Sequence, residues 1–146
     1  MNITDILSEK MVFTDLEVTG KRELLEHVSA IVAQREKLDP NMVFESVWER
    51  ENLGSTGYGN GFALPHARIE GLKKIAVAFV RLHKPLDFDA LDAQPVDLLV
   101  FLISPENSGE DHLKALSLFS RVLKNDKTRT KLRQAKTKHE IYEILQ

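Results

Sequence analysis

Residues 96–104, VDLLVFLIS, decide the class of fold. This stretch is apolar at nearly every position, which is typical of a strand that is covered on both faces of its sheet. Full burial of each Leu, Val or Ile side chain in it contributes about 1.5–3 kcal/mol. Because both faces need cover, we expect a central strand with helices packed on either side.

Two other stretches predict further strands, at residues 73–82 (KKIAVAFVRL) and within residues 11–18 (MVFTDLEV). The 146 residues suit one domain and are enough to bury a core without disulfides or metals. We therefore expect a single α/β domain, residues 1–146, in which helices flank a sheet. The order of the strands is left open.

Helical periodicity follows the first predicted strand. Residues 21–35 place apolar side chains at helical spacing, and residues 40–52 form a second candidate helix, with Asp39 as N-cap and Pro40 as its first residue. The expected buried positions of the two helices are Leu24, Leu25, Val28, Ile31 and Val32, and then Met42, Val43, Val47 and Trp48.

Three helices are expected after the central strand. Ser108–Asp111 resembles a capping box that opens the first, Asp126 is the expected cap of the second, which runs through Arg133, and Thr137–Glu140 is a second capping box. The inner positions are predicted to be Leu113, Leu116, Phe119, Val122 and Leu123 in the first helix and Ile141, Ile144 and Leu145 in the last.

Composition excludes several functions. With 20 basic and 22 acidic residues the net charge is −2, which argues against a general nucleic-acid binder. The absence of cysteine excludes disulfides, thiolate nucleophiles and cysteine zinc sites. The N-terminus has no signal-peptide pattern, and the longest apolar run, Leu98–Ile103, is too short to span a bilayer. We expect a cytoplasmic protein that is not membrane-embedded.

The stretch GSTGYGNGFALPH, residues 54–66, contains four of the seven glycines, all of them in its first eight positions. Glycine-rich loops bring backbone amides close to phosphate. However, the spacing fits neither the dinucleotide fingerprint nor a P-loop, which would need a lysine directly after Gly59, where Asn60 stands. A nucleophile elbow and a zinc-protease motif are also absent. If the protein handles phosphoryl groups, we expect the donor to be another protein and not ATP.

His66 ends this stretch, directly after Pro65. Imidazole titrates near neutrality and is a competent nucleophile that can carry a phosphoryl group. The proline would restrict the backbone and so fix the approach of the ring. The alternative is structural, because glycine-rich loops are commonly sets of turns and single histidines are commonly solvated.

The string R-E-x-x-G-S-T-G-x-G-x-G-x-A-x-P-H, from Arg50 to His66, resembles the IIA proteins of the bacterial phosphoenolpyruvate-dependent sugar phosphotransferase system, of the fructose/mannitol type. Within this family the chain is most similar to the nitrogen-regulatory branch. Residues 86–125 also resemble the second half of the family, with a strand, a loop and then H-L-x-x-L. The resemblance covers nearly the whole chain and implies a mixed β-sheet flanked by helices.

The resemblance also implies site residues. His66 would be phosphorylated, through its Nε2, by a histidine phosphocarrier protein, and Arg50 and His112 match the family's active-site arginine and second histidine. Arginine can grip phosphate in a fork, and a second imidazole can hydrogen-bond a phosphoryl oxygen and add charge as a cation. No cofactor or metal is implied.

Phosphate-binding candidates beside these are Ser55, Thr56 and Asn60. The two hydroxyls could donate to phosphate, although turn formation explains them equally well. Asn60 stands where mannitol-type transport relatives carry a glutamate, which favours the regulatory branch. Arg68 could assist, although a solvated arginine is the commoner case.

The remaining histidines, His27, His83 and His139, are expected on the surface, and the basic run Lys127–Lys138 is expected to be a solvated helix face. The phosphocarrier should need an apolar surface near His66, for which Phe62, Leu64 and the Leu113 helix are candidates. Core packing is the alternative for each.

Three functions follow from these patterns. The first is a phosphotransferase-system IIA protein that accepts phosphate on His66 and acts mainly as a nitrogen or metabolic regulator through protein targets. The second is a sugar-transport IIA that passes phosphate to a separate IIB protein. The third is a binding module in which His66 is only structural. The chain has no IIB or membrane IIC segment, which favours regulation.

Overall fold

The apolar stretch forms strand β6 (Val96–Pro105) at the centre of a six-stranded sheet in the computed structural model, which describes residues 1–146. Every residue of β6 is buried except Asp97, which is half-buried. β6 pairs antiparallel with β5 (Ala76–Leu86) along one edge and parallel with β3 (Phe62–Ala63) and β4 (His66–Ile69) along the other. The predicted central strand is therefore confirmed.

The sheet is mixed, with the order β1-β5-β6-β3-β2 and with β4 beside β6. β1 (Val12–Leu16) runs parallel to β5, and β2 (Gly57–Gly59) runs antiparallel to β3. The strand predicted at residues 73–82 begins later, at Ala76, and continues to Leu86 across an irregularity in its pairing with β6. Pairing with the long central strand holds this extension in place.

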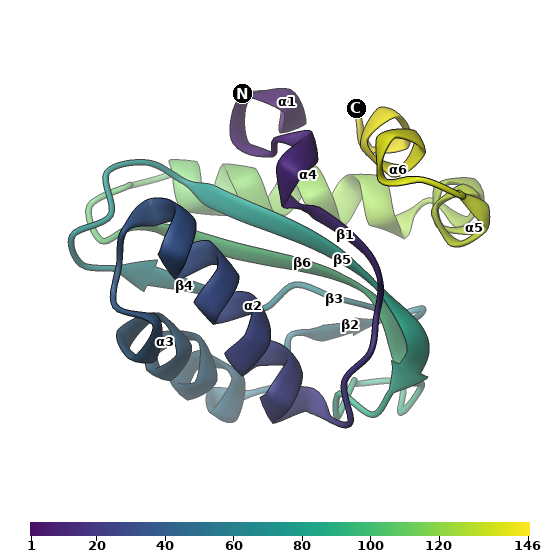
Figure 1. Cartoon of the computed structure of the whole chain (residues 1–146), viewed down its shortest axis with the longest axis horizontal. Coiled ribbons are helices and arrows are strands. Elements are labelled where there is room, and N and C mark those ends of the chain that lie inside the picture. Colours follow the sequence, from purple (N-terminus) through teal and green to yellow (C-terminus); the bar gives the residue numbers. More distant parts are fainter.

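Helices cover both faces of the sheet (Figure 1). α2 (Lys21–Glu36) and α3 (Pro40–Leu53) form one layer. The other layer contains α4 (Asp111–Lys124), α5 (Asp126–Gln134) and α6 (Lys138–Leu145), together with the short N-terminal α1 (Ile3–Ile6) and the 3-10 turn η1 (Glu9–Met11). This is the helix-flanked sheet that the sequence predicts. No helix is both long and apolar enough to cross a bilayer.

Two predicted caps are confirmed and two are wrong. Asp39 accepts a hydrogen bond from the Asn41 amide, and Thr137 accepts one from the Glu140 amide, although the Glu140 side chain accepts from the Lys136 amide and so does not complete the capping box. The Ser108 box does not form: Glu110 is the N-cap of α4, without a side-chain bond, because the Ser108 hydroxyl accepts from Arg68 instead. α5 is capped by Asn125 and not by Asp126, which is already the first helical residue.

Most predicted inner positions of the helices are buried or half-buried, but Leu113 is 62% exposed. It lies in the first turn of α4, where the buried residues are His112 and Ala115, so Leu113 lies on a face of the helix that points away from the core. Phe119 and Leu123 are fully buried further along the same helix. The expectation of an inner position for Leu113 is therefore wrong, and this leucine lies on the surface near the candidate site.

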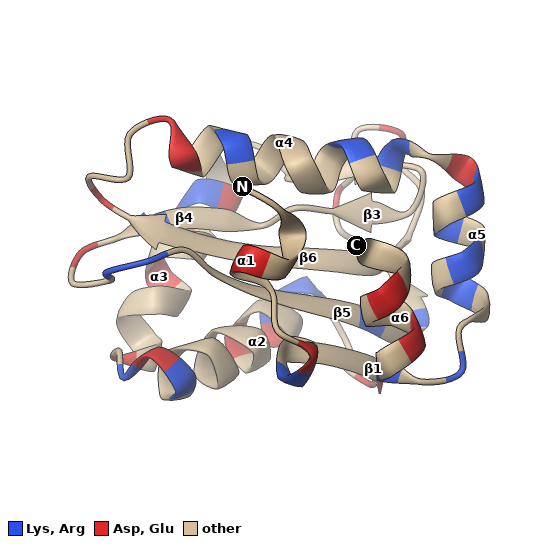
Figure 2. Cartoon of the chain, turned by 90° about the horizontal axis from the view of Figure 1, so that it is seen from above, with Lys and Arg blue, Asp and Glu red and all other residues tan.

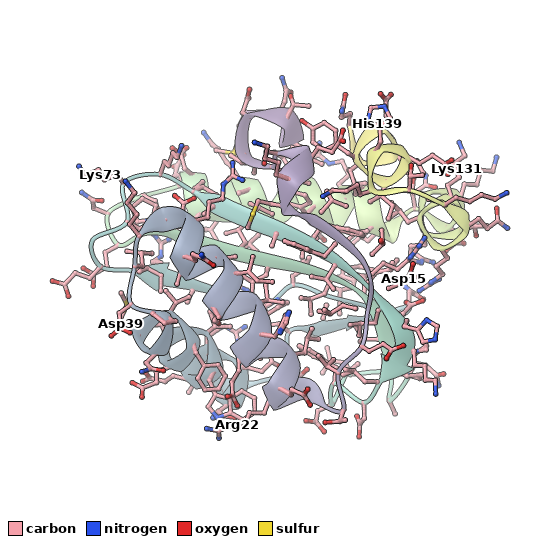
Figure 3. The ribbon with its side chains drawn as sticks, in the orientation of Figure 1. Asp15, Arg22, Asp39, Lys73, Lys131 and His139 are labelled. Carbon is pink, nitrogen blue, oxygen red and sulfur yellow. The ribbon has the colours of Figure 1, made fainter.

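The basic segment at the C-terminal end lies mainly at the surface. Figure 2 shows Lys and Arg along α5, and in Figure 3 Lys131 and His139 project outward from α5 and α6. His27, His83 and His139 are all exposed, as predicted. Arg129 is an exception to the solvated face, because it is buried and donates to the Leu123 carbonyl at the end of α4.

Candidate functional site

The glycine-rich stretch forms a tight hairpin of β2 and β3. Asn60 and Gly61 both have positive φ, 57° and 82°, at the two central positions of its turn. An Asn-Gly pair suits this geometry, since both residues tolerate the left-handed region. At Gly57, a Cβ atom would lie 2.8 Å from that of Ala90. The glycines therefore serve the turn and a close backbone approach, so the structural interpretation of the loop is the one that the fold supports.

Pro65 separates β3 from β4 and positions the residue that follows it. Its carbonyl accepts from the Leu102 amide at 3.0 Å, and His66 then pairs with Leu102 at the start of β4. Proline has no N–H, so the ladder along β6 is interrupted there. The backbone of His66 is consequently held by the most deeply buried strand of the protein.

The imidazole of His66 is half-buried and has one hydrogen bond, in which Nδ1 lies 2.7 Å from the Leu64 carbonyl oxygen. A carbonyl oxygen only accepts, so Nδ1 carries the proton and Nε2 presents a free lone pair. Burial lowers the pKa of His66, with the Arg50 charge acting in the same direction, although the Leu64 bond and the Glu51 charge oppose them. The ring is thus a neutral nucleophile at neutral pH.

His112 faces His66 from the first turn of α4. The two ring centroids are 5.4 Å apart, with the rings tilted by 57°. Nδ1 of His112 lies 2.7 Å from the hydroxyl oxygen of buried Ser104, at the end of β6. Burial, with the neighbouring His66 and the Arg68 charge, lowers the pKa of His112 to about 4. In this state His112 is neutral, and not the cation that the sequence allowed.

Two arginines complete this side of the site. A cavity of about 410 Å³ is lined by Arg50, His66, Arg68 and His112, with Glu49 as its one acidic residue. Arg50, in the last turn of α3, donates to the Gly54 carbonyl, and Arg68 donates to Ser108 and Gly109 in the loop before α4. The sequence leaves both a role beside phosphate and a solvated side chain open for Arg68, because nothing local shows that strand β4 runs beside the start of α4.

A larger cleft of about 810 Å³ opens on the other side of His66. Its apolar lining comes from Leu64 and from residues of the hairpin, of the loop before β6 and of α4 that are partly or fully exposed. All the Lys, Arg, Asp or Glu side chains that line it are cationic. These residues are Tyr58, Leu91, Leu113 and Leu116, and Arg50, Arg121 and Lys124. Phe62, a candidate for this surface, is instead fully buried in the core.

Ser55 and Thr56 line the larger cleft, but their hydroxyl protons are already used. Ser55 donates to the Phe88 carbonyl at 2.8 Å and accepts from the Gly57 amide, while Thr56 donates to the Glu51 carboxylate. A hydroxyl has a single proton to donate. In this structure both residues shape the loop and neither hydroxyl proton is free for phosphate, so their role as phosphate ligands stays a prediction.

Asn60 lies at the tip of the hairpin and lines neither cavity that contains His66. Its amide donates to Asp92 and its carbonyl accepts from Arg133. The β2–β3 hairpin carries Asn60 to the end away from β4, so the structure gives no support to phosphate binding by Asn60, which stays a prediction. No three His, Cys, Asp or Glu side chains are grouped so as to hold a metal ion.

Several known proteins are similar to this chain in sequence and in fold. Residues 5–146 match the family described as phosphoenolpyruvate-dependent sugar phosphotransferase system, EIIA 2. A nitrogen regulatory protein of Bradyrhizobium diazoefficiens is 39% identical over 99% of this chain and 95% of its own. A fructose-specific EIIA component of Haloferax volcanii is 38% identical over 73% of this chain and 70% of its own.

A solved structure agrees with both comparisons. The nitrogen regulatory protein IIA-Ntr of Neisseria meningitidis superposes with a TM-score of 0.95 at 36% identity, covering 99% of each chain. The mixed sheet, the two helical layers and nearly the full length are thus shared with a IIA protein. The chain belongs to the EIIA 2 family of the phosphoenolpyruvate-dependent sugar phosphotransferase system, among the IIA-type nitrogen regulatory proteins.

Proposed function

We propose that this protein accepts a phosphoryl group on Nε2 of His66 from a histidine phosphocarrier protein, and that its phosphorylation state regulates protein partners. The observation that carries this proposal is the state of the His66 ring. Its Nδ1–H is held by the Leu64 carbonyl, its Nε2 is free, and its pKa is lowered. A neutral imidazole with one free nitrogen, placed between two cavities, is a competent acceptor.

In the transfer step, the Nε2 lone pair of His66 attacks the phosphorus of the phosphocarrier's phosphohistidine. The new N–P bond forms as the N–P bond of the carrier breaks, and the electron pair of the broken bond returns to the carrier's imidazole nitrogen. The guanidinium groups of Arg50 and Arg68 lie beside the ring and provide positive charge for the phosphoryl oxygens. Nε2 of His112 is the third group on that side and can hydrogen-bond the same oxygens.

Phosphorylation also alters the neighbouring histidine. A phosphoryl group adds about 1.5 to 2 negative charges. Because this charge would lie beside His112, we expect it to raise the pKa of His112 from its low value. Protonated His112 would then pair with the group that His66 carries.

A mass measurement tests the acceptor. The protein is incubated with phosphoenolpyruvate, enzyme I and the phosphocarrier protein, and its intact mass should rise by one phosphoryl group. The adduct should be lost in acid and survive alkali, as phosphohistidine does. His66→Ala should fold and remain unmodified, while His83→Ala, which changes an exposed histidine elsewhere, should be modified like the wild type. Modification of His66→Ala would overturn the proposal.

Similarity to nitrogen regulatory proteins over nearly the whole chain supports regulation as the main output. The similarity to a fructose-specific EIIA component favours the second candidate, transfer of phosphate to a separate IIB protein. Pull-downs from the host lysate with unmodified and phosphorylated protein distinguish the two. Regulation predicts partner sets that differ between the two forms. Identical sets, together with rapid transfer to a IIB protein, would favour transport.

A further inference from the structure

Glu51 is a buried carboxylate next to Arg50 that the proposed phosphoryl transfer does not use. It lies in the last turn of α3, and its side chain is only 1% exposed. A buried charge is costly unless it is paired and hydrogen-bonded. Glu51 has such a partner in Lys21, at the start of α2, whose Nζ lies 2.7 Å from Oε2. This pair joins the two helices of one layer beneath the glycine-rich stretch.

The same carboxylate holds the first residues of the loop. The Thr56 amide lies 3.0 Å from Oε2 and 3.2 Å from Oε1, and the Thr56 hydroxyl also donates to Oε1. Hydrogen bonds to a charged acceptor are stronger than those between neutral groups. Thr56 is therefore fixed to the end of α3 by two donors.

From Thr56 the contacts continue to His66. The Leu64 amide donates to the Thr56 carbonyl at 3.0 Å, and the Leu64 carbonyl accepts from Nδ1 of His66 at 2.7 Å. The chain of contacts thus runs from Lys21 through Glu51, Thr56 and Leu64 to the imidazole. It involves α2, α3 and the two residues that flank the hairpin, Thr56 before β2 and Leu64 after β3.

This chain of contacts bears on which nitrogen of His66 is free. Imidazole in water exchanges between two neutral tautomers, and only the form with its proton on Nδ1 has a lone pair on Nε2. The Leu64 carbonyl selects that form because it can only accept. If the carbonyl shifted, the Nε2–H form would become populated, and that form cannot attack phosphorus through Nε2.

We infer that Glu51, paired with Lys21, is a positioning residue that keeps His66 in its Nδ1–H tautomer through Thr56 and Leu64. Glu51 does not touch the reacting atoms. It acts on the chemistry by holding the hairpin base where the Leu64 carbonyl meets the ring. The kinetic part of this inference rests on the proposed function, whereas the tautomer of His66 can be measured without any phosphoryl transfer.

Nitrogen NMR of protein with labelled histidine tests the inference. In the wild type at neutral pH, the His66 signals should show the Nδ1–H form predominating. In Glu51→Gln, one of the two acceptor oxygens is replaced by an NH2 donor, which faces either Lys21 and the Thr56 amide or the Thr56 hydroxyl, so the contacts are broken on one side and both tautomers should appear. The maximal rate of phosphorylation should fall about ten- to hundredfold, because small misplacements of a reacting group have effects of that size. The KM for the carrier should stay close to the wild-type value, since the exposed cleft is unchanged.

The matched control is Glu45→Gln, which removes the same charge from an exposed position of the same helix and should change neither measurement. If Glu51→Gln does not fold, Thr56→Val removes the hydroxyl bond to Glu51 and leaves the amide bond, whereas Thr56→Ser can keep both, so the valine variant should populate the second tautomer more than the serine variant. A folded Glu51→Gln, or in its place a folded Thr56→Val, that retains the wild-type tautomer would overturn the inference. If the wild type accepts no phosphate but has the expected tautomer, the proposed function fails and the positioning role stands.

Discussion

The β2–β3 hairpin is held at both ends by an ion pair, and the two pairs differ in their surroundings. At the base, Lys21 and Glu51 have side chains that are 13% and 1% exposed. At the tip, Arg133 and Asp97 are 37% and 18% exposed, and Arg133 also donates to the Asn60 carbonyl. The base pair leads by hydrogen bonds to His66, whereas the tip pair holds a turn that lines neither cavity containing His66. Similar chemistry thus serves a site at one end and only the fold at the other.

Breaking the base pair should have the largest effect on stability. Lys21→Met keeps a long side chain but removes the ammonium that lies over the Phe88 ring, and it leaves Glu51 buried without its cation. We expect the free energy of unfolding in urea to fall by about 3–5 kcal/mol. The double variant Lys21→Met/Glu51→Gln should recover part of this loss, because it removes the unpaired charge. A double variant less stable than Lys21→Met would contradict the pairing.

The next largest effect is expected on the rate of phosphorylation, from Arg50 near the base of the hairpin. Arg50→Ala should slow phosphorylation of His66 by about one to two powers of ten, since a hydrogen bond to a charged group contributes about 1.5–3 kcal/mol. Arg50→Lys should not restore the full rate, because lysine lacks the planar fork. Rates from rapid quench with phosphorylated carrier measure both variants. Full activity in Arg50→Ala would remove this arginine from the site.

Acid should weaken the structure near the base of the hairpin, where His66 and His112 lie, more than at its tip. The pKa of His112 is about 4 in the folded protein, below the ordinary value of about 6.5, so the unfolded chain binds this proton first. Its contribution to stability is therefore complete above about pH 6.5 and is lost as the pH falls from there to about 4. The exposed His139 has a raised pKa and contributes with the opposite sign.

Hydrogen exchange locates this acid effect. Protection of the Leu102 amide, which is bonded to Pro65 near His66, should fall more over that range than protection of the Leu98 amide, which is bonded to Gly61 at the tip. Both comparisons are corrected for the intrinsic pH dependence of exchange. In His112→Gln the difference between the two amides should shrink. Equal loss at both amides in the wild type would indicate a global effect.

The smallest effect is expected from the tip. Arg133→Met removes the partly exposed pair with Asp97, and such pairs contribute about 0–1 kcal/mol. The free energy of unfolding should fall by no more than that, and the tautomer of His66 should be unchanged. If Arg133→Met lowers the free energy of unfolding as much as Lys21→Met does, burial is not what distinguishes the two ion pairs.

Elements with a strong local pattern could be predicted from the sequence. The apolar run of β6, the periodicity of α2 and α3, and the Asp39-Pro40 start of α3 are all confirmed. The ends of elements were less predictable where a distant partner intervenes. Ser108 looks like a helix cap, but Arg68 donates to its hydroxyl. Leu113 fits an apolar stripe, but the residues of that turn that are buried are His112 and Ala115.

By itself, the sequence determined which residue types were available to the site: a histidine after proline, glycines where a tight turn needs positive φ, and an arginine at a helix end. Only the tertiary structure decided which of them meet. Parallel pairing of β4 with β6 brings His66 to the end of the strand that leads to His112 and places Arg68 beside the loop before α4. The same packing directs the Ser55 and Thr56 hydroxyls inward to Phe88 and Glu51. Hydrogen-bond partners are chosen by distance in space, which no local pattern of residues contains.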